Sequence, residues 1–455
     1  MAEELDAVVY GAAEVVVGPT REDDEAPATA AGGEADTADE SPASHDGTAP
    51  GTAEAAGLER YEDAAVAVVD GRIAAVGPTD EVTRAYPPEN ATDAVDASGR
   101  AVIPGFVDAH THALFAGDRA DEFAAKLRGK TYQEIAAEGG GILRTVRATR
   151  AASDGELLTA LLSNLDTMLV HGTTTVEVKS GYGLDVETEL RLLDAIARAD
   201  DAHPVDVVPT FMGAHAVPEG RDPDDYVDEV VDEQLPAVEG QGIAEFCDVF
   251  CEAGAFSVEQ SRRVLTAGAE VGLKPKVHAE EFGRLGGAAL AAAVGAVSAD
   301  HLLHATAEDA AALADAGVVP VFLPGTAFAL GADYADPAPF RERGLPVAVA
   351  TDFNPNCYSQ SVGCAIALAC AGMGLDPGEA LVGATRNGAL ALDRDGGLGT
   401  LREGAPGDLV VLDAPSHVHV PYNFGINTVA TVLKSGRVVH DAVSVPSGKR
   451  PGGGA

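Results

Sequence analysis

The amino-acid sequence predicts an α/β fold, a (β/α)8 barrel of the TIM type with a small β-sandwich domain formed by both ends of the chain. Eight short apolar runs alternate with helical segments between residues 101 and 350. Polar side chains follow most of these runs, and β-rich segments with tight turns stand on either side of the repeated region. A doubly wound open sheet is the structural alternative, but no Gly-x-Gly-x-x-Gly fingerprint follows the first run.

The apolar runs are four to eight residues long, as expected for strands that are buried on both faces. They cover residues 101–107, 173–178, 205–212, 244–250, 275–278, 296–299, 318–322 and 346–350. Several segments between them have helical periodicity, namely 187–199, 259–271, 285–294 and 308–316. The alternation predicts parallel strands connected by helices.

The predicted domain boundaries follow from this pattern. Residues 1–103 and 395–455 would form the two parts of the β domain, and residues 104–394 the barrel. Within the first part, residues 20–60 are an acidic low-complexity insert that cannot bury enough apolar surface to order itself. Asp70-Gly71, between two β-rich runs, predicts a hairpin turn.

The composition is strongly acidic, with 72 Asp and Glu against 30 Lys and Arg and a formal net charge of −42. This charge argues against nucleic-acid partners and, because it repels itself unless salt screens it, favours a high-salt cytosol. The five cysteines form no Cys-x-x-Cys pair, and the sequence has neither an apolar signal segment nor a run long enough to span a bilayer. We therefore expect a cytoplasmic protein without nucleic-acid or membrane partners, for which a homodimer is allowed.

A His-x-His pair, His110 and His112, follows the first apolar run. Side chains two residues apart on a strand point to the same face, so the two imidazoles can form half of a transition-metal site. The candidates for the other half follow later runs and are His278, His301 and Asp352. Three imidazoles and one carboxylate, from His110, His112, His278 and Asp352, suit either zinc or iron.

Glu281 lies three residues after His278 and can shuttle a proton between a water molecule and a substrate nitrogen. Both His301 and Asp352 are candidates for taking the proton of that water, and the choice between them stays open. Beside a metal ion, these groups indicate hydrolysis of an amide, an amidine or a cyclic amide.

Arg119 lies nine residues beyond His110 and suits two-point capture of a carboxylate. Tyr182 and His215 would add polar ring contacts. The glycine run 139–141 offers backbone N–H groups at a helix start, where an anion can bind. The expected substrate is therefore a small molecule that bears a carboxylate.

Several motifs resemble a known family. The segment PGFVDAHTH at residues 104–112 resembles the signature of the amidohydrolase superfamily. Four further segments resemble the imidazolonepropionase family more specifically: GGGILRTVRATR at 139–150, EVKSGYG at 177–183, GAHAVP at 213–218 and ATDFNP at 350–355. The resemblance runs from about residue 60 to 440, and the acidity is typical of a haloarchaeal member.

This resemblance implies hydrolysis of the cyclic amide C–N bond of 4-imidazolone-5-propanoate to N-formimidoyl-L-glutamate, a step of histidine degradation. It implies metal ligands His110, His112, His278 and Asp352, substrate contacts from Arg119, Tyr182, His215 and Glu281, and Asn354, Asn356 and Cys357 near the product. Asn356-Cys357 stands where Gly followed by Ser or Thr is expected, so a thiol replaces a hydroxyl group.

Lys179 bears on the number of metal ions. Two-metal relatives of such barrels use a carbamylated lysine after the fourth strand, whereas Lys179 follows the second run and the fourth ends in Cys251-Glu252. One Zn²⁺ or Fe²⁺/Fe³⁺ ion per subunit is therefore expected.

Two other functions remain open. Another single-metal amidohydrolase, such as an aromatic-base deaminase, would share the ligand set, but Arg119 and the glycine run favour a carboxylate substrate. A catalytically inactive barrel could serve as an interaction protein, but the complete ligand set argues against it.

Overall fold

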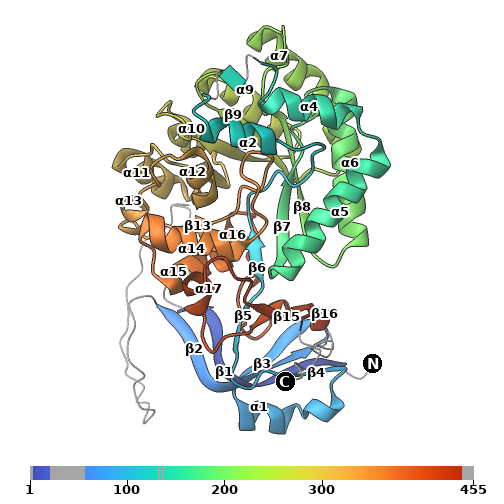
Figure 1. The fold of residues 1–455 in the computed structure, drawn as a ribbon, viewed down its shortest axis with the longest axis vertical. Helices are drawn as coiled ribbons and strands as arrows, with labels where there is room; N and C mark the ends of the chain where they lie inside the picture. Colours follow the sequence, from blue (N-terminus) through green and yellow to red (C-terminus); the bar gives the residue numbers. More distant parts are fainter. Residues whose placement is uncertain (1–3, 21–56, 132–133, 136–137, 443–455) are drawn as a thin grey trace, which may run out of the picture.

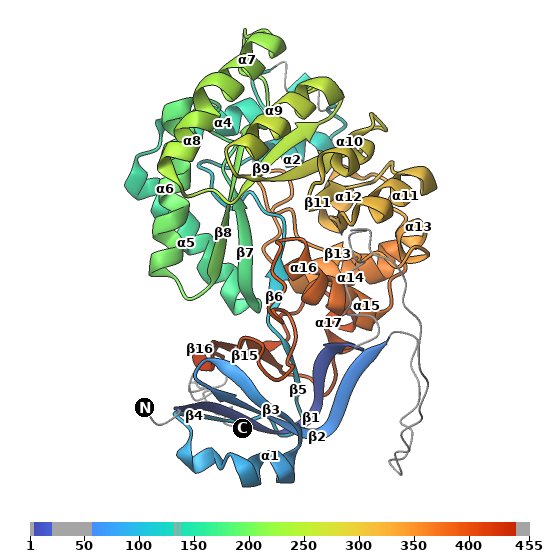
Figure 2. The same cartoon turned by 180° about the vertical axis from the view of Figure 1, so that it is seen from behind.

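The computed structural model describes residues 4–20, 57–131, 134–135 and 138–442. Its strands form two separate sheets of eight strands each. The sheet built from both ends of the chain lies at one end of the long axis, and the helix-covered barrel occupies the rest of the molecule (Figures 1 and 2). The predicted fold class, an α/β barrel with a β domain from both termini, is confirmed.

The barrel sheet is parallel, and its strands follow one another in chain order. They are β6 (Phe106–Asp108), β7 (Thr173–Lys179), β8 (Asp206–Ala214), β9 (Phe246–Cys251), β10 (Lys274–Ala279), β11 (Ser298–His301), β12 (Val319–Phe322) and β13 (Ala348–Val349). A bridge between Thr111 and Phe353, just beyond β6 and β13, brings the two edges of the sheet together. The sheet is therefore a nearly closed barrel whose carboxyl ends share one rim.

Helices connect the barrel strands and cover them from outside (Figures 1 and 2). They are α2 (Ala120–Leu127), α4 (Ile142–Ala151), α5 (Asp154–Val170), α6 (Val186–Ala202), α7 (Pro223–Glu229), the π-helical turn η2 (Val230–Gln234), α8 (Leu235–Gln241), α9 (Val258–Glu270), α10 (Gly287–Val294), α11 (Ala307–Ala316), α12 (Pro324–Leu330), α13 (Ala338–Arg341), α14 (Val362–Met373), α15 (Pro377–Gly383) and α16 (Arg386–Leu390). The four helices predicted from periodicity correspond to α6, α9, α10 and α11. None of the helices among the described residues has the length and hydropathy needed to cross a membrane.

The first apolar run is not a single strand, contrary to the prediction. It divides at Gly105 into β5 (Ala101–Pro104), which pairs with strands of the terminal sheet, and β6, which begins the barrel. A Cβ atom at Gly105 would lie 2.6 Å from Thr174 Cγ2, so the chain passes close to β7 at this point. The run carries the chain from one sheet into the other.

The terminal sheet has the order β16-β15-β14-β5-β1-β2-β3, with β4 beside β1. Its strands are β1 (Leu5–Pro19), β2 (Leu58–Val69), β3 (Arg72–Pro78), β4 (Asp93–Asp96), β5, β14 (Leu409–Leu412), β15 (Val429–Lys434) and β16 (Arg437–Asp441), and its outer helices are α1 (Thr79–Ala85) and the short turn η1 (Pro88–Asn90). The short helix α17 (His419–Tyr422) lies between β14 and β15 in the chain.

The predicted hairpin joins β2 and β3. Both turn residues have positive φ, 48° at Asp70 and 74° at Gly71, as a two-residue turn of the I′ type requires. Leu58 already pairs with Pro19 in β1, so the predicted insert 20–60 is too long at its C-terminal end. The rest of the insert, residues 21–56, lies outside the described residues.

The barrel core is built from Val, Leu, Ala and Phe, as the absence of Trp requires. Two lysines, Lys179 and Lys276, nevertheless rank among the largest fully buried side chains. The inside of the barrel is therefore charged as well as apolar.

Candidate metal centre

The carboxyl ends of three barrel strands bring together the predicted ligands. His110 and His112 follow β6, His278 lies in β10, and Asp352 follows β13. All four side chains are buried, and His301, the last residue of β11, lies beside them. Parallel strands of a barrel end at the same rim, which is why residues so far apart in the chain meet here.

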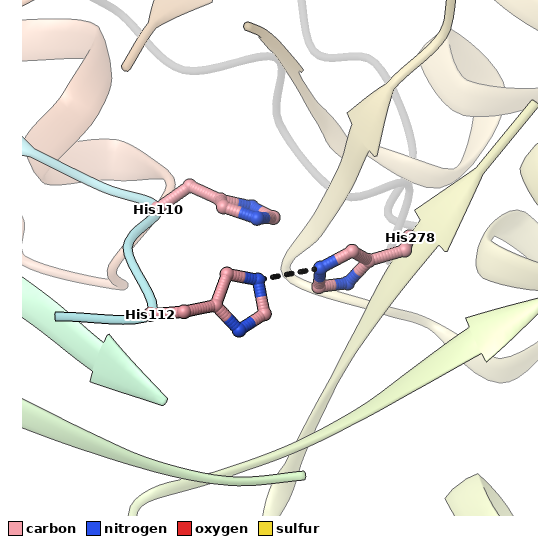
Figure 3. Close-up of side chains that lie close together, drawn as sticks. All are labelled: His110, His112 and His278. Atoms are coloured by element: carbon pink, nitrogen blue, oxygen red, sulfur yellow. Dashed lines mark hydrogen bonds between the residues drawn. The ribbon is translucent and has the colours of Figure 1, made fainter. Parts of the chain in front are cut away.

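The donor atoms of these residues converge. The Nε2 atoms of His112 and His278 lie 3.2 Å apart, and the rings of His110, His112 and His278 face a common space (Figure 3). Asp352 Oδ1 lies 3.5 Å from His110 Nε2 and 3.8 Å from His112 Nε2. These three distances are close to the spacing between two ligand atoms of one ion. Two ligand atoms that each lie ~2.0–2.1 Å from a tetrahedral ion are roughly 3.3 Å apart.

Two of these atoms, His110 Nε2 and Asp352 Oδ1, are buried and have no hydrogen-bond partner among the residues that the structure describes. Leaving a buried polar atom unpaired costs about 1–3 kcal/mol, so such atoms normally indicate a missing partner. The residues therefore fit a divalent metal ion. His301 offers a further nitrogen, because His110, His301 and Asp352 also hold ligand atoms within 4.8 Å of one another.

Two aspartates orient the histidine ligands. His110 Nδ1 donates to Asp300 Oδ2 at 2.7 Å, and His278 Nδ1 donates to Asp248 Oδ1 at 3.1 Å. A proton fixed on Nδ1 leaves Nε2 free to bind metal. Neither aspartate is predicted from the sequence; the available signals were a carboxylate inside the apolar run 244–250, at Asp248, and one directly after the run 296–299, at Asp300.

The backbone is strained next to the site. His301 has φ of 78° and Asp352 has φ of 51°, in the left-handed region that L-residues seldom adopt. Such conformations cost about 1–3 kcal/mol and persist where the surrounding structure holds them, as at functional sites. Both side chains are thereby turned toward the ligand cluster.

Glu281 lies at the side of this cluster, with Oε2 at 3.7 Å from His301 Nε2. Its burial, and then the nearby charges of Asp352 and Glu252, raise the pKa of Glu281 well above its usual value. Burial, and then the charge of His278, lower the pKa of His301 well below its usual value. Burial thus favours the protonated form of the Glu281 carboxyl group and the neutral form of the His301 imidazole.

Aromatic side chains border the cluster on one side. The His215 ring stacks on His112 with 4.7 Å between centroids, and Tyr182 lies 5.2 Å from His215. His215 Nδ1 bonds to the carbonyl of Gly181 at 3.0 Å. Burial, and then His278, lower the pKa of His215 to about 3, so this ring is neutral.

Arg119 stands at the start of α2 and pairs with Glu122, with 2.7 Å between Nε and Oε2. Its two terminal nitrogens make no hydrogen bond to any residue that the structure describes. Glu122 Oε1 also accepts the backbone N–H of Gly141 at 3.1 Å. The N–H group expected to bind a substrate anion is therefore taken by the protein's own carboxylate.

The three residues assigned to the product hold a loop together. Asn354 Nδ2 donates to the carbonyl of Asp352 at 2.8 Å, and its Oδ1 accepts from the backbone of Asn356 and Cys357. Asn356 Oδ1 accepts from Lys126 Nζ at 2.7 Å, and the buried Cys357 Sγ lies 3.6 Å from the carbonyl of Thr351. Their contacts fix the loop that carries Asp352.

Comparison with known proteins identifies the family. The chain matches the model of the amidohydrolase family over residues 101–439 and that of the imidazolonepropionase-like composite domain of bacteria over residues 64–88. It is 67% identical to an imidazolonepropionase of Haloarcula marismortui, over 96% of each chain. This chain belongs to the imidazolonepropionase family. An imidazolonepropionase of Halobacterium salinarum is 61% identical over 95% of this chain and 98% of its own.

Solved structures with much lower identity share the fold. A zinc-bound adenosine deaminase from Xanthomonas campestris has a TM-score of 0.66 and 18% identity, over 96% of this chain and 93% of its own. A triazine hydrolase variant has a TM-score of 0.69 and 17% identity, over 96% and 94%. Together with the donor set described above, membership in the amidohydrolase family implies a divalent metal ion in this imidazolonepropionase homologue.

Proposed function

We propose that this chain hydrolyses the cyclic amide C–N bond of 4-imidazolone-5-propanoate to give N-formimidoyl-L-glutamate, a step of histidine degradation. The observation that carries the proposal is the convergence of three imidazoles and one carboxylate beside Glu281, whose burial raises its pKa, in a chain 67% identical to a protein named imidazolonepropionase. A hydrolase of this kind needs both a metal ligand set and a proton donor.

His110, His112, His278 and Asp352 would hold the ion, one Zn²⁺ or Fe²⁺/Fe³⁺ per subunit. A cation at these ligands supplies polarisation of the substrate carbonyl and acidification of water. His110 and His278 are kept in the ligating tautomer by Asp300 and Asp248.

The protein side chains move the protons. Burial raises the pKa of Glu281 and so favours its protonated form, which would donate a proton to the ring nitrogen that leaves as the C–N bond breaks. The proton lost by the attacking water goes to His301 or to Asp352, which both lie within reach of the ligand cluster. His301 is the neutral acceptor of the two. Its Nε2 lies 3.7 Å from Glu281 Oε2, so His301 could pass the proton back to Glu281.

The remaining residues hold the substrate. The two free nitrogens of Arg119 suit a bidentate contact with the propanoate carboxylate. Tyr182 and His215 would pack along the imidazolone ring, while Asn354, Asn356 and Cys357 shape the product side through the loop that they hold.

Loss of imidazolone absorbance at high salt tests this function. We expect turnover by metal-loaded protein, none after chelation, and recovery when Zn²⁺ or Fe²⁺ is added back. Guanine and cytosine serve as controls for the deaminase alternative. Ammonia release from either base, without action on the imidazolone, would replace the proposed function by that alternative.

A further inference from the structure

A layer of charged side chains lies inside the barrel directly below the metal ligands. It consists of Glu177 and Lys179 on β7, Asp248 on β9, Lys276 on β10 and Asp300 on β11, all without solvent exposure. The inside of such a barrel is ordinarily filled by branched apolar side chains, and buried charges are costly unless they are paired. A whole layer of them indicates a task that apolar packing could not perform.

Lys179 is held by three carboxylates. Its Nζ lies 2.7 Å from Glu177 Oε2, 2.7 Å from Asp248 Oδ2 and 3.9 Å from Asp300 Oδ2. Burial alone would lower the pKa of Lys179, but Asp248, Glu177 and Asp300 together raise it above its usual value. The side chain is therefore a permanent cation.

Lys276 is a second cation in the same layer. Its Nζ lies 2.9 Å from Glu177 Oε1 and 4.0 Å from Asp300 Oδ2, and it donates to the carbonyl of Ala109 at 3.0 Å. Glu177 thus bridges the two lysines, and Thr210 Oγ1 adds a hydrogen bond of 2.6 Å to its Oε1.

The layer is connected to the ligands through two carboxylates. Asp248 accepts from Lys179 on one side and from His278 on the other, and Asp300, beside both lysines, accepts from His110. Strand register makes these contacts possible, because His278 pairs with Asp300 across β10 and β11, and Lys276 pairs with Asp248 across β9 and β10.

We propose that Lys179 and Lys276 are positioning residues of the metal centre, whose ammonium groups hold Asp248 and Asp300 where these orient His278 and His110. The inference rests on the metal site of the proposed function but not on the substrate. Three carboxylates and two ammonium groups leave one negative charge beside the ion. Without either lysine the carboxylates would repel one another and turn away from the imidazoles.

The same layer explains why a second ion has no place here. His110, Glu177 and Asp300 offer ligand atoms within 4.8 Å of one another, which is a spacing suited to a cation. The two ammonium groups supply positive charge at that point, at 2.7 and 2.9 Å from the Glu177 oxygens.

The test is the affinity of metal-free full-length protein for Zn²⁺ alone, measured at high salt by competition with a chelating dye. Lys179→Met and Lys276→Met should each weaken binding about 10–100-fold, which is the usual effect of losing an outer partner of a metal ligand, here the aspartate that each lysine holds in place. The melting temperature of each metal-free variant is recorded in parallel.

Lys434→Met is the matched control. Lys434 is also a buried lysine between two carboxylates, 2.6 Å from both Asp206 Oδ2 and Asp408 Oδ2, but it belongs to the terminal sheet. The Lys434→Met substitution should lower the melting temperature and leave Zn²⁺ affinity within about twofold of wild type, since affinity and stability are separate readouts.

Three results would overturn the inference. The first is a Zn²⁺ affinity in both Lys179→Met and Lys276→Met that equals that of wild type. The second is a loss of Zn²⁺ affinity in Lys434→Met as large as the loss in those two variants. If Lys179→Met does not fold, Lys179→Gln replaces it, because glutamine keeps a hydrogen-bond donor but loses the charge. Lys179→Gln should weaken Zn²⁺ binding, and unchanged Zn²⁺ binding in this variant is the third result. A wild-type protein that binds no Zn²⁺ would instead remove the metal site and the proposed function first.

Discussion

In two of the candidate ligands, the two nitrogens of the imidazole ring have different roles. His110 and His278 each bind an aspartate through Nδ1, which leaves Nε2 available for the proposed metal ion. The sequence predicts the ligands themselves, because each polar residue follows an apolar run. It does not predict Asp248 and Asp300 as their partners, since those contacts depend on which strand lies beside which and in what register.

Arg119 offers a residue-level test of substrate binding. Arg119→Ala should raise KM about thirtyfold, because a charged hydrogen bond is worth about 2 kcal/mol. Metal content should stay at the wild-type level, since Arg119 contacts Glu122 and no ligand. Arg191→Ala, which removes a surface ion pair with Asp154, serves as the control. Loss of metal in Arg119→Ala would show that this arginine is structural.

His215 makes a prediction about pH. Its pKa of about 3 in the folded chain lies below the ordinary value, so the unfolded chain binds the proton first and stability falls with acid. Between pH 7.5 and 5, the free energy of unfolding of wild type should fall by about 2 kcal/mol more than that of His215→Asn, because this contribution to stability is lost from about pH 6.5 downward. Urea unfolding of the chelated proteins at both pH values measures this difference. A difference in unfolding free energy between wild type and His215→Asn that is the same at both pH values would contradict a buried neutral imidazole.

At the scale of elements, strand ends were easier to predict than strand partners. The eight runs and the hairpin at Asp70-Gly71 follow from periodicity and turn chemistry. The division of residues 101–107 between two sheets does not, because both halves are equally apolar. The two halves meet at Gly105, where the backbone passes close to the Thr174 side chain.

That passage can be tested by a pair of glycine variants. Gly105→Ala should destabilise the protein by roughly 1–3 kcal/mol, because its Cβ would overlap the Thr174 side chain. Gly240→Ala, in α8 with nothing within 4 Å, should stabilise it slightly, since alanine favours helix. Thermal unfolding at high salt compares the two. Equal effects would mean that the crossing from β5 to β6 is not tight.

At the scale of the whole molecule, the fold class and the convergence of the candidate ligands could be predicted, whereas the charged layer could not. Glu177, Lys179 and Lys276 look like ordinary strand residues until the barrel closes and points them all inward. The domain boundaries at residues 103/104 and 394/395, the cytoplasmic location and the homodimer stay predictions.

The net charge of −42 predicts dependence on salt. The Debye length rises from about 3 Å at 1 M to about 30 Å at 0.01 M, so repulsion between surface carboxylates reaches across the molecule in dilute buffer. Circular dichroism should report unfolding on dialysis from about 2 M to about 0.05 M KCl. Sucrose in place of KCl is the control: it stabilises folded proteins through its exclusion from their surface but screens no charge, so it should protect less than KCl. A chain equally stable in both buffers would contradict the expected high-salt adaptation.

X-ray absorption at the zinc edge of the loaded protein tests the metal centre most directly. We expect one ion per chain with only nitrogen and oxygen neighbours at about 2.0–2.2 Å, three of them showing the outer scattering of imidazole rings. Sulfur neighbours at about 2.3 Å, or fewer than three imidazoles, would contradict it.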